Sequence, residues 1–125
     1  MEEEVDVVIV DDLKDAAEAL ACLLEMDGYR VAVAFDGAQA LQTIEARRPH
    51  CVLLDFNLPD LDGLELTRQL RARYGDDIVL VAVTGYSDDN ERVADTFARV
   101  DHHFIKPVLP AQLRKVLPPI APLPG

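Results

Sequence analysis

The sequence is poor in three features that would assign it to common classes of protein. It has only two cysteines, Cys22 and Cys51, too few for a disulfide framework, and we expect both to be buried thiols in a reducing compartment. No apolar run approaches the roughly 18 residues that a membrane-spanning helix needs. The N-terminus, Met-Glu-Glu-Glu, is acidic where a signal peptide would be basic. We therefore expect a cytoplasmic protein with no membrane partner.

Positive charge is also scarce. Twelve Lys and Arg residues stand against 23 Asp and Glu residues, which gives a formal net charge of −11. This balance argues against direct binding of nucleic acid. It suits either ordinary solubility or a protein that handles cations or meets a basic surface. The length of 125 residues, half of them hydrophobic, is that of one domain with a core of its own.

Short apolar segments alternate with helical patterns along the chain. We expect strands at 5–10, 31–34, 51–54, 78–83 and 103–105, and helices at about 16–26, 37–47, 63–73, 89–98 and 110–117. The strands lack polar alternation, so both faces of the sheet are expected to be covered, as in a parallel α/β fold. An acidic N-terminus at 1–4 is expected to be disordered, and the Pro-rich stretch 118–125 reads as a tail or linker.

Local signals predict where several of these helices begin and end. Gly28 is expected to stop the first helix, and Pro110 suits the first position of the last. An Asp N-cap with Glu or Gln three residues later is expected at four helix starts: Asp15 with Glu18, Asp36 with Gln39, Asp62 with Glu65, and Asp88 with Glu91. The inward faces are expected to carry Ala16, Leu20, Leu23 and Leu24 in the first helix, and Ala38, Leu41 and Ile44 in the second.

Polar residues follow four of the five strands. The second strand is followed only by Asp36, which is assigned to a cap. The other four strands are followed, in chain order, by Asp11 and Asp12, by Asp55, by Thr84, and by Lys106. Parallel strands deliver such groups to one edge, and the strand order 2-1-3-4-5 would leave the second strand at the far side. This is the flavodoxin-like three-layer sandwich of five parallel strands and five helices, with Asp55 at the surface of the sheet edge.

The predicted cluster of carboxylates indicates a hard cation and phosphoryl chemistry. Asp11, Asp12 and Asp55 would repel one another unless a cation neutralised them. Oxygen ligands without His or Cys favour Mg²⁺ or Mn²⁺. Thr84 and Lys106 would then contact a phosphoryl group carried by Asp55.

In this order, the motifs resemble the receiver domain of two-component response regulators over about residues 5–117. The matching stretches are V-D-D at 10–12, L-L-D at 53–55, L-P-D-L-D-G at 58–63, T-G at 84–85 and I-K-P at 105–107. The stretch 101–108 is more similar to receivers fused to hybrid histidine kinases than to those of transcription factors.

The resemblance implies a role for each matching residue. Asp55 would be the phospho-acceptor. Asp12, with help from Asp11, would ligate Mg²⁺, and Asn57 would add its backbone carbonyl. The family contacts to the phosphoryl group fall on Thr84 and Lys106, and Pro107 would follow a cis peptide bond.

The resemblance also implies partners and a signal. The donor would be a phosphohistidine on a histidine kinase or a phosphotransfer domain. The signal would be a population shift on the face from the fourth strand to the fifth helix, driven by Thr84. A downstream output domain or protein, and a homodimer that forms on phosphorylation, are further expectations.

Two positions leave alternatives open. His103 stands where the family usually has Tyr or Phe as a rotating switch, and it is either that switch or a half-exposed strand residue. Tyr86, two residues after Thr84, either overhangs the site and slows attack by water or is a surface aromatic.

Three other functions compete with the phospho-acceptor. A haloacid-dehalogenase-type phosphatase needs a second Asp where Asn57 stands. A flavodoxin-type binding module needs a phosphate-cradling loop, and the acidic pair after the first strand would repel a flavin phosphate. A receiver-like docking domain that works without phosphorylation remains a third alternative.

Overall fold

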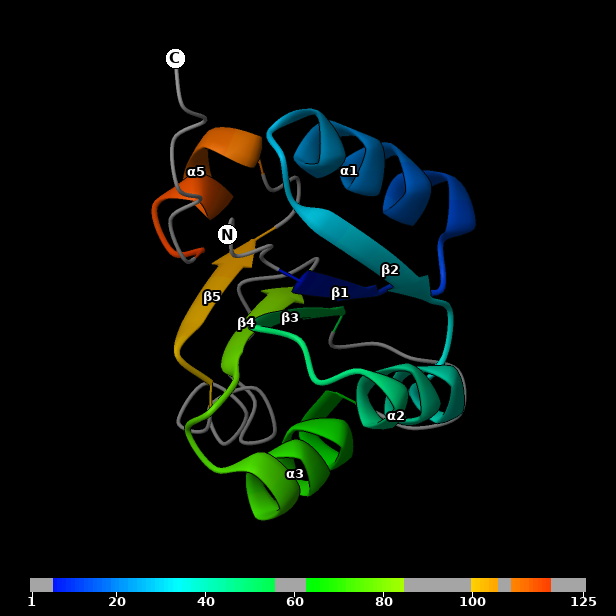
Figure 1. Ribbon diagram of the computed structural model, residues 1–125, viewed down its shortest axis with the longest axis vertical. Coiled ribbons are helices and arrows are strands. Elements are labelled where there is room, and N and C mark those ends of the chain that lie inside the picture. The colour runs from blue at the N-terminus through cyan, green and yellow to red at the C-terminus, as the bar shows by residue number, and fades with distance from the viewer. Residues whose placement is uncertain (1–5, 56–62, 85–99, 106–108, 118–125) are drawn as a thin grey trace.

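The computed structural model describes residues 6–55, 63–84, 100–105 and 109–117. Figure 1 shows a central sheet with helices on both sides of it. The elements are β1 (Asp6–Val10), α1 (Lys14–Met26), β2 (Arg30–Ala34), α2 (Gly37–Ala46), β3 (Cys51–Asp55), α3 (Gly63–Tyr74), β4 (Val79–Thr84), β5 (His102–Ile105) and α5 (Pro110–Arg114). The helix expected at 89–98 lies outside the described residues.

The five strands are parallel and lie in the order β2-β1-β3-β4-β5, which confirms the expected topology. Register brings the carboxyl ends of β1, β3, β4 and β5 to one edge of the sheet. The last pairs in the ladders are Val10 with Leu54, Asp55 with Val83, and Thr84 with Ile105. Since β1 and β3 are neighbours whose crossovers leave in opposite directions, this edge contains the switch point where such sheets bind ligands.

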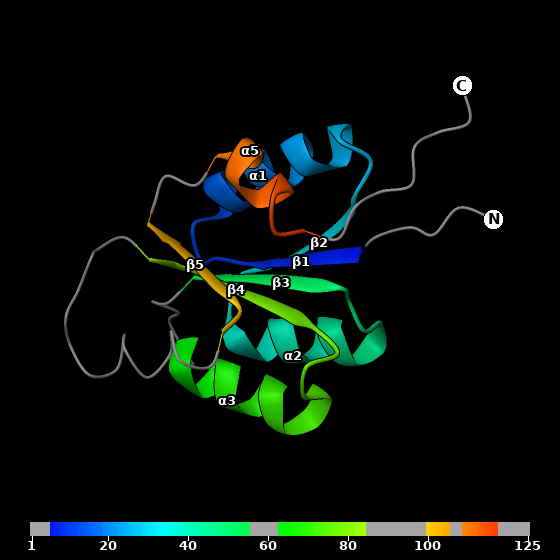
Figure 2. The ribbon, with the colours of Figure 1, turned by 90° about the vertical axis from the view of Figure 1, so that its left-hand side faces the viewer.

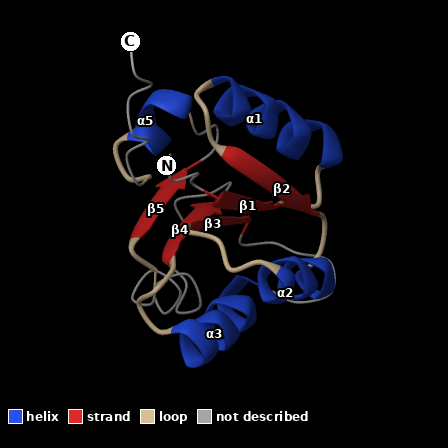
Figure 3. Ribbon diagram, in the orientation of Figure 1, coloured by secondary structure: helices blue, strands red, loops and turns tan. Residues whose placement is uncertain are grey.

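Both faces of the sheet are covered, as the unbroken apolar strands predict. Figures 2 and 3 show α1 and α5 on one face and α2 and α3 on the other. Alternate residues of each strand supply the two cores: Val7 and Ile9 pack on the α1 side, and Val8 and Val10 pack on the other. The sheet is therefore buried between two apolar layers, which leaves its edges as the places for polar chemistry.

The predicted start of the first helix is wrong by two residues. The helix begins at Lys14, Leu13 occupies the N-cap without a side-chain hydrogen bond, and Asp15 lies in the first turn. The reason is local, because the carboxylate of Asp11 accepts a hydrogen bond from the Leu13 N–H at 2.9 Å and turns the chain directly after β1. Asp15 is therefore not a cap.

The cap predicted at the second helix is confirmed. Asp36 accepts a hydrogen bond from the Gln39 N–H at 2.7 Å, and the Gln39 side chain accepts one from the Phe35 N–H at 3.0 Å. The other two predicted caps, Asp62 and Asp88, lie outside the described residues.

The inward face of α1 also differs from the prediction. Leu24 is buried and Leu20 packs partly buried against the core, as predicted, but Ala16 is exposed and Leu23 is 45% exposed. The other buried residues of the helix are Ala17 and Ala21. This helix is apolar on most of its circumference, so periodicity alone does not select a face, and the small alanines allow the closer approach to the sheet. As a consequence Cys22 is exposed, contrary to expectation, while Cys51 is buried in β3.

The second helix shows the same kind of error on a smaller scale. Its buried residues are Gly37, Ala40 and Ile44. Ile44 was predicted correctly and Leu41 is half-buried, but Ala38 is exposed. Again a small residue, Ala40, lies against the sheet, because side-chain volume decides which ridge of the helix fits the closest approach.

Helix ends follow the glycine signal at α1 and depart from prediction at α5. Gly28 has a φ of 102°, and the N–H groups of Gly28 and Tyr29 donate to the carbonyls of Glu25 and Leu24, which is a Schellman end. The last helix begins at Pro110 as predicted but ends at Arg114, before the predicted limit at residue 117. Within the part of the chain that the structure describes, no helix is long and apolar enough to cross a membrane.

Candidate phosphoryl and metal site

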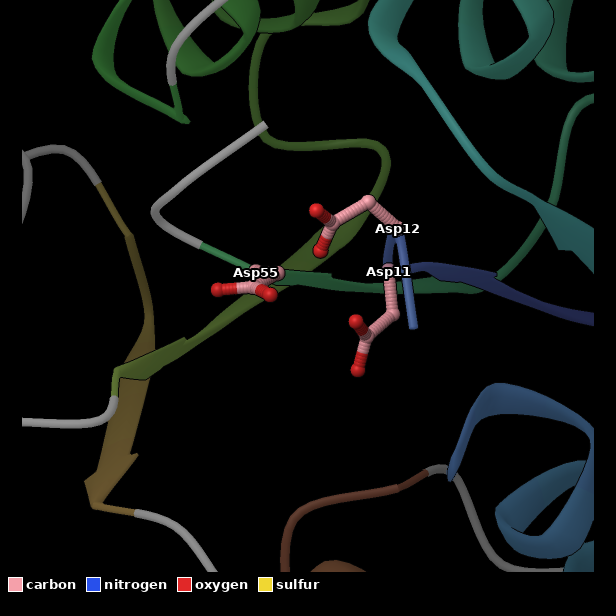
Figure 4. A group of neighbouring side chains, drawn as sticks. All are labelled: Asp11, Asp12 and Asp55. Atoms are coloured by element: carbon pink, nitrogen blue, oxygen red, sulfur yellow. The ribbon is translucent and has the colours of Figure 1, made fainter. Parts of the chain in front are cut away.

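Three carboxylates converge at the carboxyl edge of the sheet. Asp11 and Asp12 directly follow β1, and Asp55 is the last residue of β3 (Figure 4). One carboxylate oxygen from each residue lies within 4.8 Å of the other two. Because β1 and β3 are hydrogen-bonded neighbours, the sheet itself holds these groups together.

Two of the three carboxylates are buried. Asp11 is 9% exposed and Asp55 is 5% exposed, whereas Asp12 is exposed. The expectation that Asp55 lies at the surface of the sheet edge is therefore corrected. The backbone pairing of β3 with β4 continues to Asp55 and Val83, so Asp55 is enclosed by the last pair of the ladder.

An apolar cavity of about 240 Å³ adjoins the two buried carboxylates. Its walls come from β1, β3, β4 and α1, and include Ile9, Leu53 and Val83. Apolar walls lower the local dielectric and strengthen the repulsion between neighbouring negative charges. The surroundings of Asp11 and Asp55 therefore favour a bound cation.

Leu13 is a component of the site that the sequence did not single out. Its N–H is held by Asp11, its side chain lines the cavity, and 58% of its surface remains exposed. The sequence signal that could have identified Leu13 is an apolar residue directly after the acidic pair and before a helix. The hydrogen bond holds Oδ1 of Asp11 against the backbone at the start of α1.

The donor set fits a hard divalent cation. All three donors are carboxylates, two are withdrawn from water, and one remains open to solvent. Mg²⁺ is usually bound by a few carboxylates together with water and phosphate oxygens, which suits a cluster with one open side. The residues present therefore match the ion class predicted from the sequence.

The remaining predicted site residues are described in part or not at all. Thr84 ends β4 at the same edge, one residue beyond the partner of Asp55, and pairs with Ile105 of β5. The side chain of Thr84 is not described. Four predicted residues lie outside the described residues: Asn57, Tyr86, Lys106 and Pro107.

His103 lies on β5 and its side chain is exposed. In register it pairs with Ala82, two residues before the end of β4. It therefore stands below the acidic edge, on the outermost strand of the sheet. This position is compatible with both predicted readings, a switch side chain and a strand residue.

The fold and the site together define a class of protein: a doubly wound parallel α/β domain with an acidic cluster at its switch point. The sequence profile of the response regulator receiver domain matches residues 7–118. The chain therefore belongs to the family of response regulator receiver domains.

Individual relatives agree with this assignment. The response regulator MprA of Mycobacterium ulcerans is 41% identical over 103 residues, which cover 82% of this chain and 44% of that protein. The chain thus spans less than half the length of the curated relatives it matches. A CheY-like receiver domain from Methylobacillus flagellatus is 33% identical with a TM-score of 0.81, covering 91% of this chain and 96% of that one.

A third relative is informative about the site. The receiver domain of a sensor histidine kinase from Pseudomonas aeruginosa PAO1 is 28% identical with a TM-score of 0.80, covering 91% of this chain and 94% of that one. That structure holds a magnesium ion coordinated in its active-site cleft. Family membership supports a phospho-acceptor role in two-component signalling for this domain. The phosphatase alternative is left without support.

Proposed function

We propose that Asp55 accepts a phosphoryl group from a phosphohistidine in a reaction that needs Mg²⁺. The observation that carries this proposal is the convergence of Asp11, Asp12 and Asp55, whose oxygens lie within 4.8 Å of one another at the end of two paired strands. Asp55 is the nucleophile because it is the most buried of the three and sits at the end of the central strand. Asp12 and Asp11 are the metal ligands, joined by Asp55 and by the backbone carbonyl of Asn57. Mn²⁺ fits the same oxygen donors.

The reaction exchanges one bond to phosphorus for another. A carboxylate oxygen of Asp55 attacks the phosphorus, and the P–N bond to the donor imidazole breaks, so that the imidazole leaves with the electron pair. A bound Mg²⁺ supplies charge neutralisation on the phosphoryl oxygens. Lys106 offsets charge on a second oxygen, and Thr84 donates a hydrogen bond to another.

The other predicted residues act around this step. Pro107 shapes the loop that carries Lys106, and Tyr86 limits access of water to the aspartyl phosphate. On phosphorylation, movement of Thr84 toward the phosphate shifts the population of the β4–α5 face. His103 is the switch side chain on β5, in place of the usual aromatic ring.

The partners follow from this chemistry. The donor is a histidine kinase or a histidine phosphotransfer domain, and the signal passes to an output domain or a separate protein. A homodimer that forms on phosphorylation is part of the same proposal. Direct contact with nucleic acid or a membrane is not part of the proposal, because the net charge of −11 opposes anionic partners.

The test is labelling by a small phosphodonor such as acetyl phosphate, with and without Mg²⁺. The parent protein is expected to gain one phosphoryl group only when Mg²⁺ is present, and Asp55→Asn is expected to gain none. Asp36→Asn is the matched control, because it removes one negative charge near the same edge but leaves the cluster intact. Intact-mass spectrometry measures the mass gained by the parent, by Asp55→Asn and by Asp36→Asn.

Equal labelling of Asp55→Asn and the parent would overturn the assignment of the acceptor. Absence of labelling in the parent, together with unchanged binding of a partner, would favour the docking domain that works without phosphorylation. The switch is tested separately by amide shifts on adding Mg²⁺ and beryllofluoride. Changes that reach Thr84 and His103 are expected, and changes confined to the acidic pocket would contradict the switch.

A further inference from the structure

A second cavity, of about 220 Å³, lies at the edge of the sheet opposite the carboxylate cluster. The strands β1 and β2 begin at this edge, and α2 packs against both of them (Figure 2). The apolar walls come from the first residues of the two strands and from Pro49. The polar groups that line it are Asp6, Arg30, Thr43 and Arg47. We call this space the amino-edge cavity.

The carboxylate of Asp6 fixes the two arginines. Arg30 donates to it from Nε at 2.7 Å and from Nη2 at 3.0 Å, and Nε of Arg47 lies 3.5 Å from its Oδ2. The backbone of Asp6 is held in turn, because its N–H donates to Nδ1 of His50 at 3.1 Å and its carbonyl accepts the His50 N–H at 2.9 Å. Side chains that are already positioned lose little conformational freedom when a ligand binds.

Arg47 and Thr43 keep donor groups for such a ligand. A guanidinium has five N–H donors, and that of Arg47 is 61% exposed. In the part of the chain that the structure describes, its one contact with a carboxylate is the 3.5 Å ion pair with Asp6. Thr43 stands four residues earlier, so the two side chains share one face at the C-terminal end of α2. Both line the amino-edge cavity.

The charge around the cavity suits a single negative charge on the ligand. Arg30 and Arg47 supply two positive charges and Asp6 removes one, which leaves one. The carbonyl end of α2 opposes an anion with only about half a charge. Asp11, where the acidic cluster begins, lies about 16 Å from Asp6 along β1. This exceeds the screening length of about 8 Å at physiological ionic strength, so the net charge of −11 does not govern this edge.

We propose that the amino-edge cavity binds a small carboxylate with an apolar body, of the size of benzoate. The planar guanidinium of Arg47 matches a carboxylate through two parallel hydrogen bonds, and the hydroxyl of Thr43 donates another. The apolar body rests on Ala32 and Pro49. A cavity of about 150 Å³ can hold a benzene ring, so the volume is sufficient. A dianionic phosphate fits less well, because its second charge would face Asp6.

Titration of the full chain with benzoate, followed by amide chemical shifts, tests the proposal. Saturating shifts are expected at Ala32, Thr43 and Arg47. Benzamide has the same shape without the charge, and it is expected to bind at least tenfold more weakly because hydrogen bonds to a charged group are stronger. Acetate keeps the carboxylate but lacks the ring, and it is also expected to bind at least tenfold more weakly. The site uses no residue of the phosphoryl chemistry, so the proposal is independent of that function.

Variants at the end of α2 identify the group that binds. Arg47→Gln is expected to weaken benzoate binding at least tenfold. Arg48→Gln is the matched control, because Arg48 is the next residue and its 3.5 Å ion pair with Asp77 is exposed on both sides. It should keep the affinity of the parent. Thr43→Val keeps the shape of the side chain without the hydroxyl and is expected to lose about threefold.

Equal affinity of the parent and Arg47→Gln would overturn the proposal. Equal losses in Arg47→Gln and Arg48→Gln would overturn it too, because they would indicate a general effect of charge. The same holds if benzoate produces no saturable shift in the parent, or if inorganic phosphate binds more tightly than benzoate. Circular dichroism checks the folding of each variant, and the comparison of benzoate with benzamide needs only the parent protein.

Discussion

Asp11, Asp12 and Asp55 are held close together although their charges repel. The sheet imposes this arrangement, since the strands that carry them are hydrogen-bonded neighbours. The repulsion lowers stability locally, and the cation of the proposed function would offset that loss. Removing one of the charges should therefore stabilise the domain in the absence of the cation.

We expect Asp55→Asn to raise the free energy of unfolding by about 1 kcal/mol in chelator-treated protein, because it relieves repulsion within the cluster. Urea denaturation followed by circular dichroism measures the difference. Asp36→Asn is the control of equal charge change, and it should stay within about 0.5 kcal/mol of the parent because Asn is an equally good N-cap. A similar gain in both variants would point to net charge and not to the cluster.

Added Mg²⁺ should instead stabilise the parent more than a variant that lacks one carboxylate of the cluster. A ligand at 100 times its dissociation constant stabilises the folded state by about 2.7 kcal/mol. The parent is expected to gain that amount, and Asp12→Asn is expected to gain markedly less because it lacks one carboxylate ligand. Glu18→Gln removes an exposed charge outside the cluster and should gain as much as the parent. The idea is contradicted if chelation leaves the urea midpoint of the parent unchanged.

At the scale of elements, one arginine of α3 ties together three segments. Arg71 donates to the carbonyls of Gly75 at 2.8 Å and Ile78 at 3.1 Å, and to the carboxylate of Asp101 at 2.9 Å. Asp101 also accepts a hydrogen bond from the Leu80 N–H at 2.8 Å. This network fixes the turn between α3 and β4 and places the start of β5 beside β4. It supports the strand on which the predicted switch residue lies.

We expect Arg71→Ala to lower the free energy of unfolding by about 2 kcal/mol, because it leaves two carbonyls and a carboxylate without their charged donor. Its side chain is only 18% exposed, so water replaces the guanidinium poorly. Arg73→Ala is the matched control on the same helix. Its ion pair with Glu45 spans 4.0 Å at the surface, so a loss below about 0.5 kcal/mol is expected. Equal losses by thermal denaturation would argue against the network.

The pH dependence of this network has a definite sign. Partial burial raises the pKa of Asp101, but the hydrogen bonds from the Leu80 N–H and Arg71 and the charge of Arg71 outweigh it, so the pKa lies below the ordinary 3.8. Its stabilising contribution is therefore complete above the unfolded-state pKa and is lost as pH falls through the lower folded-state value. Since the side chain is 40% exposed, solvent screening keeps the contribution small.

Asp101→Asn should accordingly destabilise the protein most at pH 6 to 7 and progressively less as the pH falls below about 4. Urea titrations of both proteins at several pH values measure this difference. Asp77→Asn, whose ion pair with Arg48 is exposed on both sides, should show no such trend. A difference that stays constant down to pH 3 would contradict the assigned pKa direction.

At the scale of the whole molecule, the two thiols report on different events. Cys22 is exposed on α1, whereas Cys51 is 0% exposed in β3, the middle strand of the sheet. Burial raises the pKa of the Cys51 thiol to about 12. In the folded state the thiol is therefore neither accessible to a reagent nor ionised to the reactive thiolate. Reaction at Cys51 requires that the sheet itself opens.

One thiol per chain is therefore expected to react with Ellman's reagent in native protein, and the second only at the rate of global unfolding. The second phase should accelerate with urea in step with the loss of circular dichroism. Cys22→Ser removes the fast phase and leaves the slow one as a control. A slow phase that is insensitive to urea would show that β3 is reached through local opening.

The sequence by itself determined the topology and the edge of the sheet at which Asp11, Asp12 and Asp55 meet. Apolar strands without alternation require cover on both faces, and the positions of Asp11, Asp12, Asp55 and Thr84 after their strands give the order β2-β1-β3-β4-β5. Asp36 and Gly28 marked helix ends correctly because capping is chemistry between near neighbours. These features depend on local spacing, which the sequence states directly.

Only the tertiary structure decided which faces are buried and how deep the site lies. Helix α1 is apolar nearly all round, so packing volume, and not periodicity, turned Ala17 and Ala21 inward and left Leu23 and Cys22 outside. Asp15 is not the predicted N-cap of α1, because the carboxylate of Asp11 already bonds the backbone of the turn between β1 and α1. Asp55 proved to be buried because the pairing of β3 with β4 extends to its own position. Each of these outcomes depends on the shape of a neighbouring element, which no stretch of sequence contains.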